Sequence, residues 1–269
     1  MRIAFTKMNG AGNDFIVIDN RDQTIQLDAT QIERLCDRQR GVGADGLLLL
    51  EPNTTGTADW SWQFFNSDGG TAEMCGNGAR CFAAYIRDLT KNNAPFTFET
   101  QAGVIDAQFE GIQVTVTLTP PENLELDQVL EMGGTELRSH SLNTGVPHAI
   151  VFVDDADQAM VLEQGRAIRQ HPHFAPAGTN VNFVQILEPG KIRVRTYERG
   201  VEGETLACGT GVSAAAMITS RIQQFQPPIA VQVQGGDLLE VDFTASENGF
   251  SNVKLTGPAE IVFTGEIEI

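Results

Sequence analysis

The sequence has few positive charges and no long hydrophobic run. It carries 18 Lys and Arg against 35 Asp and Glu, a formal net charge of −17 at pH 7. A phosphate backbone or an anionic membrane surface would be repelled, so we expect neither nucleic acid nor membrane as a partner. The amino terminus, residues 1–7, alternates like a strand and lacks the apolar core of a signal peptide, and no segment has the length of a transmembrane helix. We therefore expect a cytoplasmic protein.

Cysteine is scarce as well. Four cysteines occur in 269 residues and none forms a CxxC pair, which excludes a disulfide scaffold and a zinc ribbon. His171 and His173 flank a proline with no further ligand pattern, so we expect a loop there and no metal site. Cys36 and Cys81 fall within predicted helices and are expected to be structural.

The first half of the chain combines period-two segments with two helical patterns. Strands are predicted at residues 3–7, 15–19, 47–51, 60–66, 96–100 and 112–118. A helix is predicted from about residue 30 to 38, with Asp28 as its N-cap, and a second at 76–89, where Ala79, Phe82, Ala83 and Ile86 share one face. These patterns predict that the first half forms a sheet wrapped around a helix.

A change in composition at residues 120–134, with two prolines at its start and two glycines at its end, is the best candidate for a domain boundary. Strands are predicted again at 137–142, 149–153, 181–187 and 192–197, followed by a helix at 209–221 and short strands at 229–269. We expect lobes at 1–118 and 119–257, with residues 258–269 completing the first lobe.

The two halves share a weak repeat. The motif CGNG at Cys75 matches CGTG at Cys208, and both precede a segment rich in alanine. Gly12 matches Gly145 and residues 64–66 match 197–199 at the same offset of 133 residues. A repeat of this length predicts two similar lobes, and not a solenoid, whose repeats are far shorter. The predicted fold is α+β, with two pseudo-symmetric lobes that each wrap a curved mixed β-sheet around a central α-helix, and the chemistry is expected in a cleft between them.

Each of these two cysteines lies at the predicted start of a helix. The unpaired amides and positive dipole end there favour a thiolate, and such placement lowers the pKa of a thiol from its usual value of about 8.5. Inverting a stereocentre needs a base on one face and an acid on the other. Cys75 and Cys208, one from each lobe, satisfy that requirement.

The glycines beside the cysteines point to the same chemistry. Turns without side chains at two helix N-termini can present N–H donors to a carboxylate held between them. Proton loss at Cα of an amino acid turns its carboxylate into an enediolate, which such donors stabilise as an oxyanion hole does. The site would then need no pyridoxal, metal or nucleotide cofactor.

Other interpretations of the cysteines remain open. A cysteine beside glycine is often a buried small hydrophobe, and the pair could form a disulfide under oxidising conditions. A non-catalytic amino-acid-binding protein could use two helix N-termini as a clamp. A thiol peroxidase or cysteine hydrolase would need a histidine paired with the cysteine, and neither cysteine has one nearby in sequence.

Eight-residue and shorter motifs across nearly the whole chain give it a family resemblance. They are MNGAGNDF at residues 8–15, FNSDG at 65–69, CGNGARC at 75–81, GTNVNF at 178–183, YERG at 197–200 and ETLACGTG at 204–211. In their order and spacing the chain resembles the diaminopimelate epimerases, a family of two-cysteine, pyridoxal-independent isomerases. The resemblance implies interconversion of LL- and meso-2,6-diaminopimelate in lysine and cell-wall synthesis, and a homodimer.

The resemblance also implies roles for individual residues. Cys75 and Cys208 would be the acid/base pair, supported by His148 and Glu198. Backbone donors for the reacting carboxylate would come from Gly76, Asn77, Gly209 and Thr210. The implied substrate-binding side chains are Asn13, Asn66, Asn180, Glu198 and Arg199. The planar fork of Arg199 suits the distal carboxylate, since it can bond both oxygens.

Two positions depart from the family pattern. Many members have Gln where this chain has Gly46, and Asn where it has Val146. Each change removes a polar side chain near the implied substrate. A racemase for another amino acid, such as proline or histidine, is therefore a second interpretation of the same cysteine pair.

Overall fold

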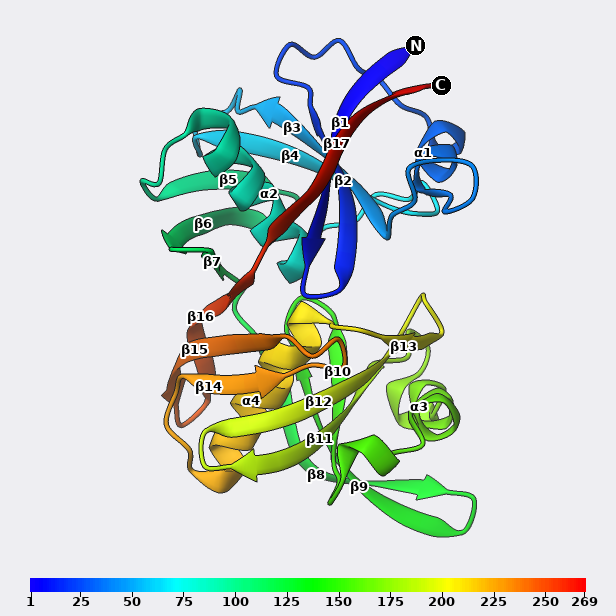
Figure 1. Ribbon diagram of the computed structural model, residues 1–269. Helices are drawn as coiled ribbons and strands as arrows, with labels where there is room; N and C mark the ends of the chain where they lie inside the picture. The colour runs from blue at the N-terminus through cyan, green and yellow to red at the C-terminus, as the bar shows by residue number, and fades with distance from the viewer. The chain divides into compact units, whose positions relative to one another are not determined.

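The computed structural model describes all 269 residues, and the chain divides into two compact units (Figure 1). Unit 1 comprises Met1–Thr117 and Gly257–Ile269, and unit 2 comprises Leu118–Thr256. None of the helices has the length and apolar character needed to cross a membrane.

Unit 1 contains a mixed β-sheet and two helices. Its elements are β1 (Arg2–Gly10), β2 (Asn13–Asp19), α1 (Ala29–Cys36), β3 (Gly46–Pro52), β4 (Trp60–Asn66), α2 (Gly76–Thr90), β5 (Phe96–Thr100), β6 (Gly103–Glu110), β7 (Gln113–Thr117) and β17 (Glu260–Glu268). The pairs β2–β3 and β4–β5 are parallel, with α1 and α2 as their crossovers, whereas β1–β2, β3–β4, β5–β6 and β6–β7 are antiparallel. The chain's last strand, β17, runs antiparallel to β1, so both termini lie together in this unit.

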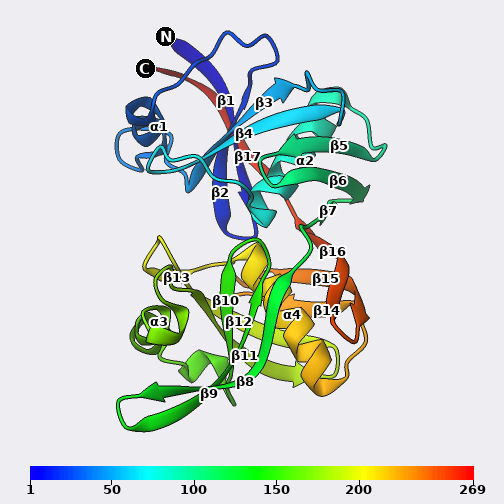
Figure 2. The ribbon, with the colours of Figure 1, turned by 180° about the vertical axis from the view of Figure 1, so that it is seen from behind.

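The elements of unit 2 are β8 (Glu122–Met132), β9 (Thr135–Asn143), β10 (Pro147–Phe152), α3 (Val161–Arg169), β11 (Asn180–Glu188), β12 (Lys191–Glu198), β13 (Gly203–Thr205), α4 (Gly209–Gln223), β14 (Ile229–Gln232), β15 (Leu238–Ser246) and β16 (Gly249–Pro258), with short 3-10 turns at Ala156–Gln158 and Pro172–Phe174. From β9 to β16, unit 2 repeats the order of elements from β1 to β7, with one additional strand, β13 (Figure 2). Its strand β8 precedes the repeat and pairs with β9, whereas β17 follows it in unit 1 and pairs with β1. Here β10–β11 and β12–β14 are parallel, with α3 and α4 as crossovers, and β9–β10, β11–β12, β14–β15 and β15–β16 are antiparallel. The same connections in both units confirm the predicted α+β fold of two similar lobes.

The central helix of each unit is α2 or α4. Each has 15 residues, begins directly after a cysteine N-cap and ends at a left-handed residue, Lys91 or Gln224. The offset of 133 residues therefore holds at both ends of the helix. Ten residues of α2 and eleven of α4 are buried, as expected for a helix that is covered on all sides. In unit 1, α2 packs against β1, β2, β3, β7 and β17; in unit 2, α4 packs against β9 to β12, β14 and β15.

The shorter helices α1 and α3 have one buried face each. Asp28 caps α1 as predicted and forms a capping box with Gln31. Ile32 and Leu35 of α1 join a core cluster with side chains of β1, β2 and β3. In α3, Gly165 allows the helix to approach β12, because a Cβ there would lie 2.5 Å from Tyr197 Cβ. Each sheet therefore has a long buried helix and a short amphipathic one.

The strand ladders identify equivalent residues in the two units. Phe15 of β2 lies opposite Gly46 of β3, and His148 of β10 lies opposite Asn180 of β11, each in a parallel pair. Since the connections and strand directions match, His148 occupies in unit 2 the position that Phe15 has in unit 1.

The same ladders extend the comparison by one strand. Leu48 pairs with Phe64 across β3 and β4, and Asn182 pairs with Thr196 across β11 and β12. Polar side chains in unit 2 thus replace apolar ones in unit 1.

The constant offset of 133 residues between the two halves does not hold at the end of β4. The constant offset of 133 matches Asn66 with Arg199, but Asn66 pairs with Gly46, whose equivalent is Asn180. Val181 pairs with Tyr197 in an antiparallel ladder, which sets Asn180 opposite Glu198. The structural counterpart of Asn66 is therefore Glu198.

Several elements were not predicted correctly from the sequence. The short strand β13 was not predicted, and residues 229–269, predicted as short strands, include β15, β16 and β17 with 9, 10 and 9 residues. Residues 122–132, interpreted as part of a boundary segment, form the long strand β8 paired with β9. Its side chains are mostly exposed and its register shifts twice, with positive φ at Asn123 and Asp127, so no regular alternation marks it. Helix α3 was not predicted because it has a central glycine and no side-chain N-cap hydrogen bond. Strand β6 was not predicted because only two of its side chains, Ile105 and Ala107, are buried.

Candidate active site

Cys75 lies at the N-cap of α2 with an extended backbone, and its thiol takes part in two hydrogen bonds. Its Sγ accepts from the Gly78 backbone N–H at 3.4 Å, as an N-cap side chain does. Its Sγ also lies 3.6 Å from Asn13 Oδ1, to which it donates. A carbonyl oxygen is only an acceptor, so this second contact requires a proton on the sulfur.

The orientation of the Asn13 amide is fixed by its other end. Asn13 Nδ2 donates to Asp45 Oδ2 at 2.6 Å, and a carboxylate only accepts. Oδ1 is thereby directed to Cys75 and to Asn77 Nδ2, which is 3.5 Å away. Asp45 holds the carbonyl oxygen of Asn13 toward the thiol.

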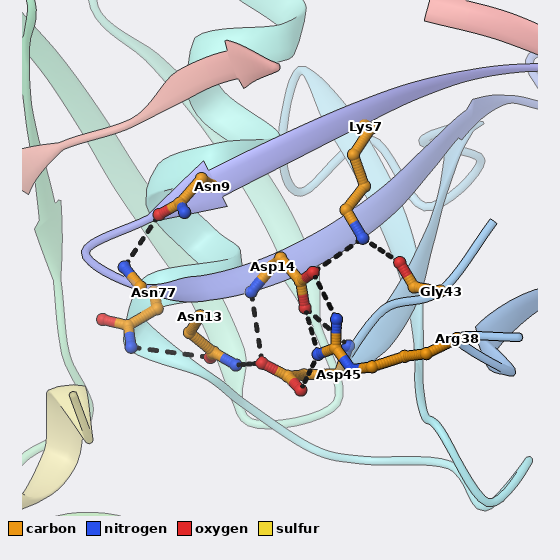
Figure 3. Close-up of polar contacts among 9 residues, drawn as sticks. Lys7, Asn9, Asn13, Asp14, Arg38, Gly43, Asp45 and Asn77 are labelled. Carbon is orange, nitrogen blue, oxygen red and sulfur yellow. Dashed lines mark hydrogen bonds and ion pairs between the residues drawn. The ribbon is translucent and has the colours of Figure 1, made fainter. Parts of the chain in front are cut away.

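Asp45 belongs to an ion-pair network with Lys7, Asp14 and Arg38 (Figure 3). The guanidinium of Arg38 donates to both oxygens of Asp14, at 2.9 and 3.0 Å, and to Asp45 at 2.8 Å. Lys7, almost completely buried, pairs with Asp14 at 2.7 Å and donates to the Gly43 carbonyl. Burial alone would raise the pKa of Asp14, but hydrogen bonds from Arg38 and Lys7 outweigh it and lower that pKa to about 2. The network keeps the Asp14 carboxylate charged.

Arg80 stabilises the first turn of α2 through hydrogen bonds. This arginine is completely buried and donates to Asn77 Oδ1 at 2.9 Å and to the Gly76 carbonyl at 3.3 Å. Its Nε reaches the Pro258 carbonyl at 3.5 Å, in the segment that returns to unit 1. Gly10 lets β1 approach this turn, since a Cβ there would lie 2.9 Å from the Asn77 carbonyl oxygen.

Cys208 occupies the equivalent N-cap of α4, with different neighbours. Its Sγ lies 3.5 Å from Thr210 Oγ1. Thr210 Oγ1 is in turn 2.9 Å from His148 Nε2, and Thr144 Oγ1 donates to the Thr210 carbonyl at 3.0 Å. His148 therefore reaches the sulfur through a hydroxyl group and not directly.

His148 is completely buried on β10. Burial, with a smaller contribution from the positive charge of Arg199, lowers the pKa of His148 to about 3. The imidazole is therefore neutral near pH 7 and has one N–H to donate. Its Nδ1 lies 3.2 Å from Asn182 Nδ2.

The residues at the end of β12 surround the same region of unit 2. Asn180 uses both ends of its amide, since Nδ2 donates to the Pro147 carbonyl at 3.1 Å and Oδ1 accepts from the Arg199 backbone N–H at 2.8 Å. Glu198 Oε2 accepts from the Thr205 hydroxyl at 2.9 Å. The Arg199 guanidinium donates to the Ala177 carbonyl at 3.4 Å and is partly exposed. Asn180 thus shapes the backbone that carries Glu198 and Arg199.

Asn66 ends β4 at a turn and its side chain is exposed. Its backbone N–H donates to the Gly70 carbonyl at 2.8 Å, and Gly69 N–H returns to its carbonyl at 3.0 Å. The next residue, Ser67, donates its backbone N–H to the Asp45 carbonyl at 3.2 Å, so Asn66 lies close in the chain to the segment that supports Asn13.

The two departures from the family pattern have different consequences. A Cβ at Gly46 would lie 2.8 Å from the Phe65 carbonyl oxygen and 2.9 Å from Phe64 Cε2. The space beside Gly46 is occupied by aromatic rings, so packing requires glycine. Val146 is half-buried, and its carbonyl accepts from Thr144 N–H at 3.1 Å.

The other two cysteines have the environment of structural residues. None of the four cysteines is in a disulfide. Burial raises the pKa of both the Cys36 and the Cys81 thiol to about 12. Cys36 belongs to the core cluster around α1, and Cys81 lies inside α2. No group of three or more His, Cys, Asp or Glu side chains is arranged to hold a metal ion.

Several residues of the site were not found from the sequence. Asp45, Arg38 and Lys7 resemble ordinary surface charges, and Asn182 resembles a polar residue of a buried strand. The structure brings them to the site through hydrogen bonds between distant segments. The one available signal was that Asn182 falls at an apolar position of the strand, where a buried amide needs partners.

Comparison with known proteins gives a consistent picture. The family model described as diaminopimelate epimerase matches residues 5–123 and 140–262. The "Diaminopimelate epimerase" of Aquifex aeolicus (strain VF5) is 44% identical over 277 residues, covering 98% of this chain and 97% of that protein. That of Thioalkalivibrio sulfidiphilus (strain HL-EbGR7) is 42% identical over 286 residues and covers both chains completely.

Solved structures share the fold at much lower identity. A hydroxyproline epimerase from Agrobacterium vitis, with bound trans-4-hydroxy-L-proline, has a TM-score of 0.75 at 17% identity, covering 99% of this chain and 92% of that one. A phenazine biosynthesis protein of the PhzF family from Bacillus anthracis has a TM-score of 0.76 at 16% identity and covers both chains completely. On the strength of the family model and of the relatives above 40% identity, this chain belongs to the diaminopimelate epimerase family.

Proposed function

We propose that this protein interconverts LL- and meso-2,6-diaminopimelate, with Cys75 and Cys208 as the acid and base. The observation that carries the proposal is the equivalent placement of two cysteines at the N-caps of α2 and α4 within a member of this family. One thiolate removes the Cα proton from one face, and the other thiol delivers a proton to the opposite face. Both sulfurs thereby exchange roles when the direction reverses.

The intermediate places negative charge on the reacting carboxylate. We propose that backbone N–H groups of Gly76, Asn77, Gly209 and Thr210, in the first turns of the two helices, donate to its oxygens. The first N–H groups of a helix point beyond its start and carry the positive end of the helix dipole. Each such donor contributes about 3 to 4 kcal/mol to stabilising an oxyanion in related settings. This supplies the electron sink that pyridoxal would otherwise provide, so we propose that the reaction needs no cofactor.

The distal end of the substrate needs recognition of an ammonium and a carboxylate group. We assign this to Asn66, Asn180, Glu198 and Arg199, together with Asn13 beside Cys75. Arg199 would hold the carboxylate with its two parallel N–H groups. Glu198 and the amide oxygens would accept from the ammonium. Because Asn180 already uses Oδ1 on the Arg199 backbone, it contributes an N–H and not its carbonyl oxygen.

His148 assists as a neutral group. A buried imidazole with a pKa of about 3 accepts no proton near pH 7. It acts on Cys208 by holding the Thr210 hydroxyl.

We further propose that the enzyme works in the cytoplasm as a homodimer, in the synthesis of lysine and cell-wall precursors. Support for the dimer comes from β17, where Ile261, Val262 and Phe263 are 43%, 56% and 46% exposed. Exposed apolar side chains gathered on one strand mark a surface that a second copy of the chain can bury. The lobe limits proposed from the sequence, 1–118 and 119–257, would assign one cysteine to each lobe.

The test uses reduced, purified protein with LL-diaminopimelate, and follows formation of the meso isomer by chiral chromatography. Cys75→Ala and Cys208→Ala serve as inactive controls, and Cys36→Ala as a matched cysteine control that retains turnover. Proline and histidine are tested in parallel. Racemisation of either one, without turnover of diaminopimelate, would assign the cysteine pair to another substrate. Binding of diaminopimelate without epimerisation by the reduced protein would favour a non-catalytic role.

A further inference from the structure

The amide of Asn182 has an orientation that its neighbours determine completely. Asn182 lies on β11 and is completely buried. Its Nδ2 donates to the Ala149 carbonyl at 3.2 Å, and Thr196 Oγ1 donates to its Oδ1 at 2.9 Å. Because a backbone carbonyl only accepts, the NH2 group must face Ala149 and cannot be exchanged with the oxygen.

This orientation determines the tautomer of His148. The second N–H of the Asn182 amide points to His148 Nδ1 at 3.2 Å, so Nδ1 must be the acceptor. A neutral imidazole then carries its proton on Nε2. Nε2 lies 2.9 Å from Thr210 Oγ1 and donates to it.

Thr210 consequently has its own proton available for the sulfur. Its oxygen already accepts from His148, and it also contacts Cys208 Sγ at 3.5 Å. A hydroxyl that donates to a thiolate stabilises the charged form. The hydrogen bonds therefore run in one direction, from the Asn182 amide through His148 and Thr210 to Cys208.

We propose that Asn182 is a positioning residue of the acid/base site, which fixes the His148 tautomer so that the Thr210 hydroxyl donates to Cys208 and holds it as the resting thiolate. The inference rests on the proposed function, because it assigns a starting state to the two cysteines of that reaction. Asn182 contacts neither the sulfur nor the reacting carbon and acts through His148.

Gly211 makes this arrangement possible. A Cβ at position 211 would lie 2.3 Å from Asn182 Oδ1 and 3.2 Å from His148 Cε1. The amide and the imidazole therefore pack directly against the first turn of α4. Of the charged side chains in unit 2, Arg199 acts electrostatically on His148, and the Glu198 carboxylate accepts from Thr205.

Cys75 accepts from the Gly78 backbone N–H, but its side-chain partner has the opposite sense to that of Cys208. Its sulfur donates to Asn13 Oδ1, which Asp45 holds in place. A thiolate at Cys75 would face that oxygen lone pair, so the resting proton is on Cys75. In the first turnover Cys208 S⁻ takes the Cα proton and becomes a thiol. Cys75 S–H then gives its proton to the carbanion and becomes a thiolate, which balances protons and charge without any redox change.

The test measures the pH dependence of alkylation at each cysteine in substrate-free, reduced protein, with iodoacetamide and quantification of each cysteine's peptide by mass spectrometry. In the wild type, Cys208 should react at lower pH than Cys75. Asn182→Leu should move the Cys208 profile to higher pH by about one unit, or about tenfold slower alkylation at neutral pH, and leave Cys75 in place. Val184→Ala, a buried change two residues along β11, is the packing control and should move neither profile.

Two further variants test the proposal if Asn182→Leu folds poorly. Thr210→Val removes the hydroxyl and should shift Cys208 in the same way, whereas Thr210→Ser keeps it and should restore the wild-type profile. Long-range proton–nitrogen NMR of histidine in the wild type should show His148 with its proton on Nε2. A proton on Nδ1, or an unchanged Cys208 profile in folded Asn182→Leu, would overturn the proposal. None of these readouts requires turnover, so they are separable from a failure of the epimerase assignment.

Discussion

The two units have the same connections but surround their cysteines differently. In unit 1, Phe15 and Phe64 pack edge to face, with ring centroids 6.1 Å apart, and the contacts of Cys75 come from Asn13 and the ion pairs behind it. In unit 2 the equivalent positions hold His148 and Thr196, joined through Asn182. The repeated scaffold places two sulfurs equivalently, but their side-chain partners differ. Cys75 donates to Asn13 Oδ1, whereas in our proposal Cys208 accepts from the Thr210 hydroxyl.

The largest expected effect comes from the cysteines themselves. Cys75→Ser and Cys208→Ser should each lower kcat by about 10³-fold or more, since a serine hydroxyl is a far weaker acid and base than a thiol. Steady-state assays in both directions measure this. Retention of more than about one-tenth of the wild-type kcat by either variant would show that the two cysteines do not act as a pair.

Acid should affect unit 2 before unit 1. The pKa of His148 is about 3 when folded and about 6.5 when unfolded, so between these values the unfolded chain binds more protons and stability falls as the pH falls. The slope is at most about 1.4 kcal/mol per pH unit. For Asp14, lowered to about 2, the corresponding loss occurs only between about pH 4 and 2.

Urea unfolding at pH 7 and pH 5 tests this difference. The wild type should lose more stability between the two pH values than His148→Asn does, whereas Asp14→Asn should show the wild-type loss. Equal losses in wild type and His148→Asn would contradict a buried, neutral histidine.

Equivalent glycines provide a smaller contrast. Gly211→Ala places a Cβ 2.3 Å from Asn182 Oδ1, whereas Gly78→Ala places one 3.3 Å from Phe15 Cε1. We expect Gly211→Ala to lower stability by about 1–3 kcal/mol. The change at Gly78 should stay within about 1 kcal/mol, since alanine regains helix propensity there. Similar values in thermal or urea unfolding would argue against the tight packing of His148 and Asn182 on α4.

The smallest expected effect concerns the support of Asn13. Asp45→Asn removes the charge that fixes the Asn13 amide, and the replacement amide can face it with either end. We expect kcat/KM to fall by about tenfold, or about 1.4 kcal/mol, with the alkylation profile of Cys75 altered and that of Cys208 unchanged. Asp37→Asn, at the partly exposed C-cap of α1, is the matched charge control.

Much of this organisation was predictable from sequence patterns. The alternating strands, the Asp28 cap and the two helices after CGNG and CGTG follow local rules, and the repeat indicated two similar lobes. Strand β8 was missed because it is exposed and bulged, and the repeat could not show that Asn66 matches Glu198. Asn182 and Asp45 could not be identified because their importance depends on a single hydrogen-bond partner far away in sequence.

The most direct test of the central claim follows deuterium during early turnover of LL-diaminopimelate in deuterium oxide. If two cysteines act on opposite faces, the meso product should carry deuterium at the inverted carbon, while recovered substrate keeps its hydrogen. Mass spectrometry of both isomers at less than about one-tenth conversion measures this. Deuterium appearing equally in recovered substrate and product would indicate a single base and contradict the account.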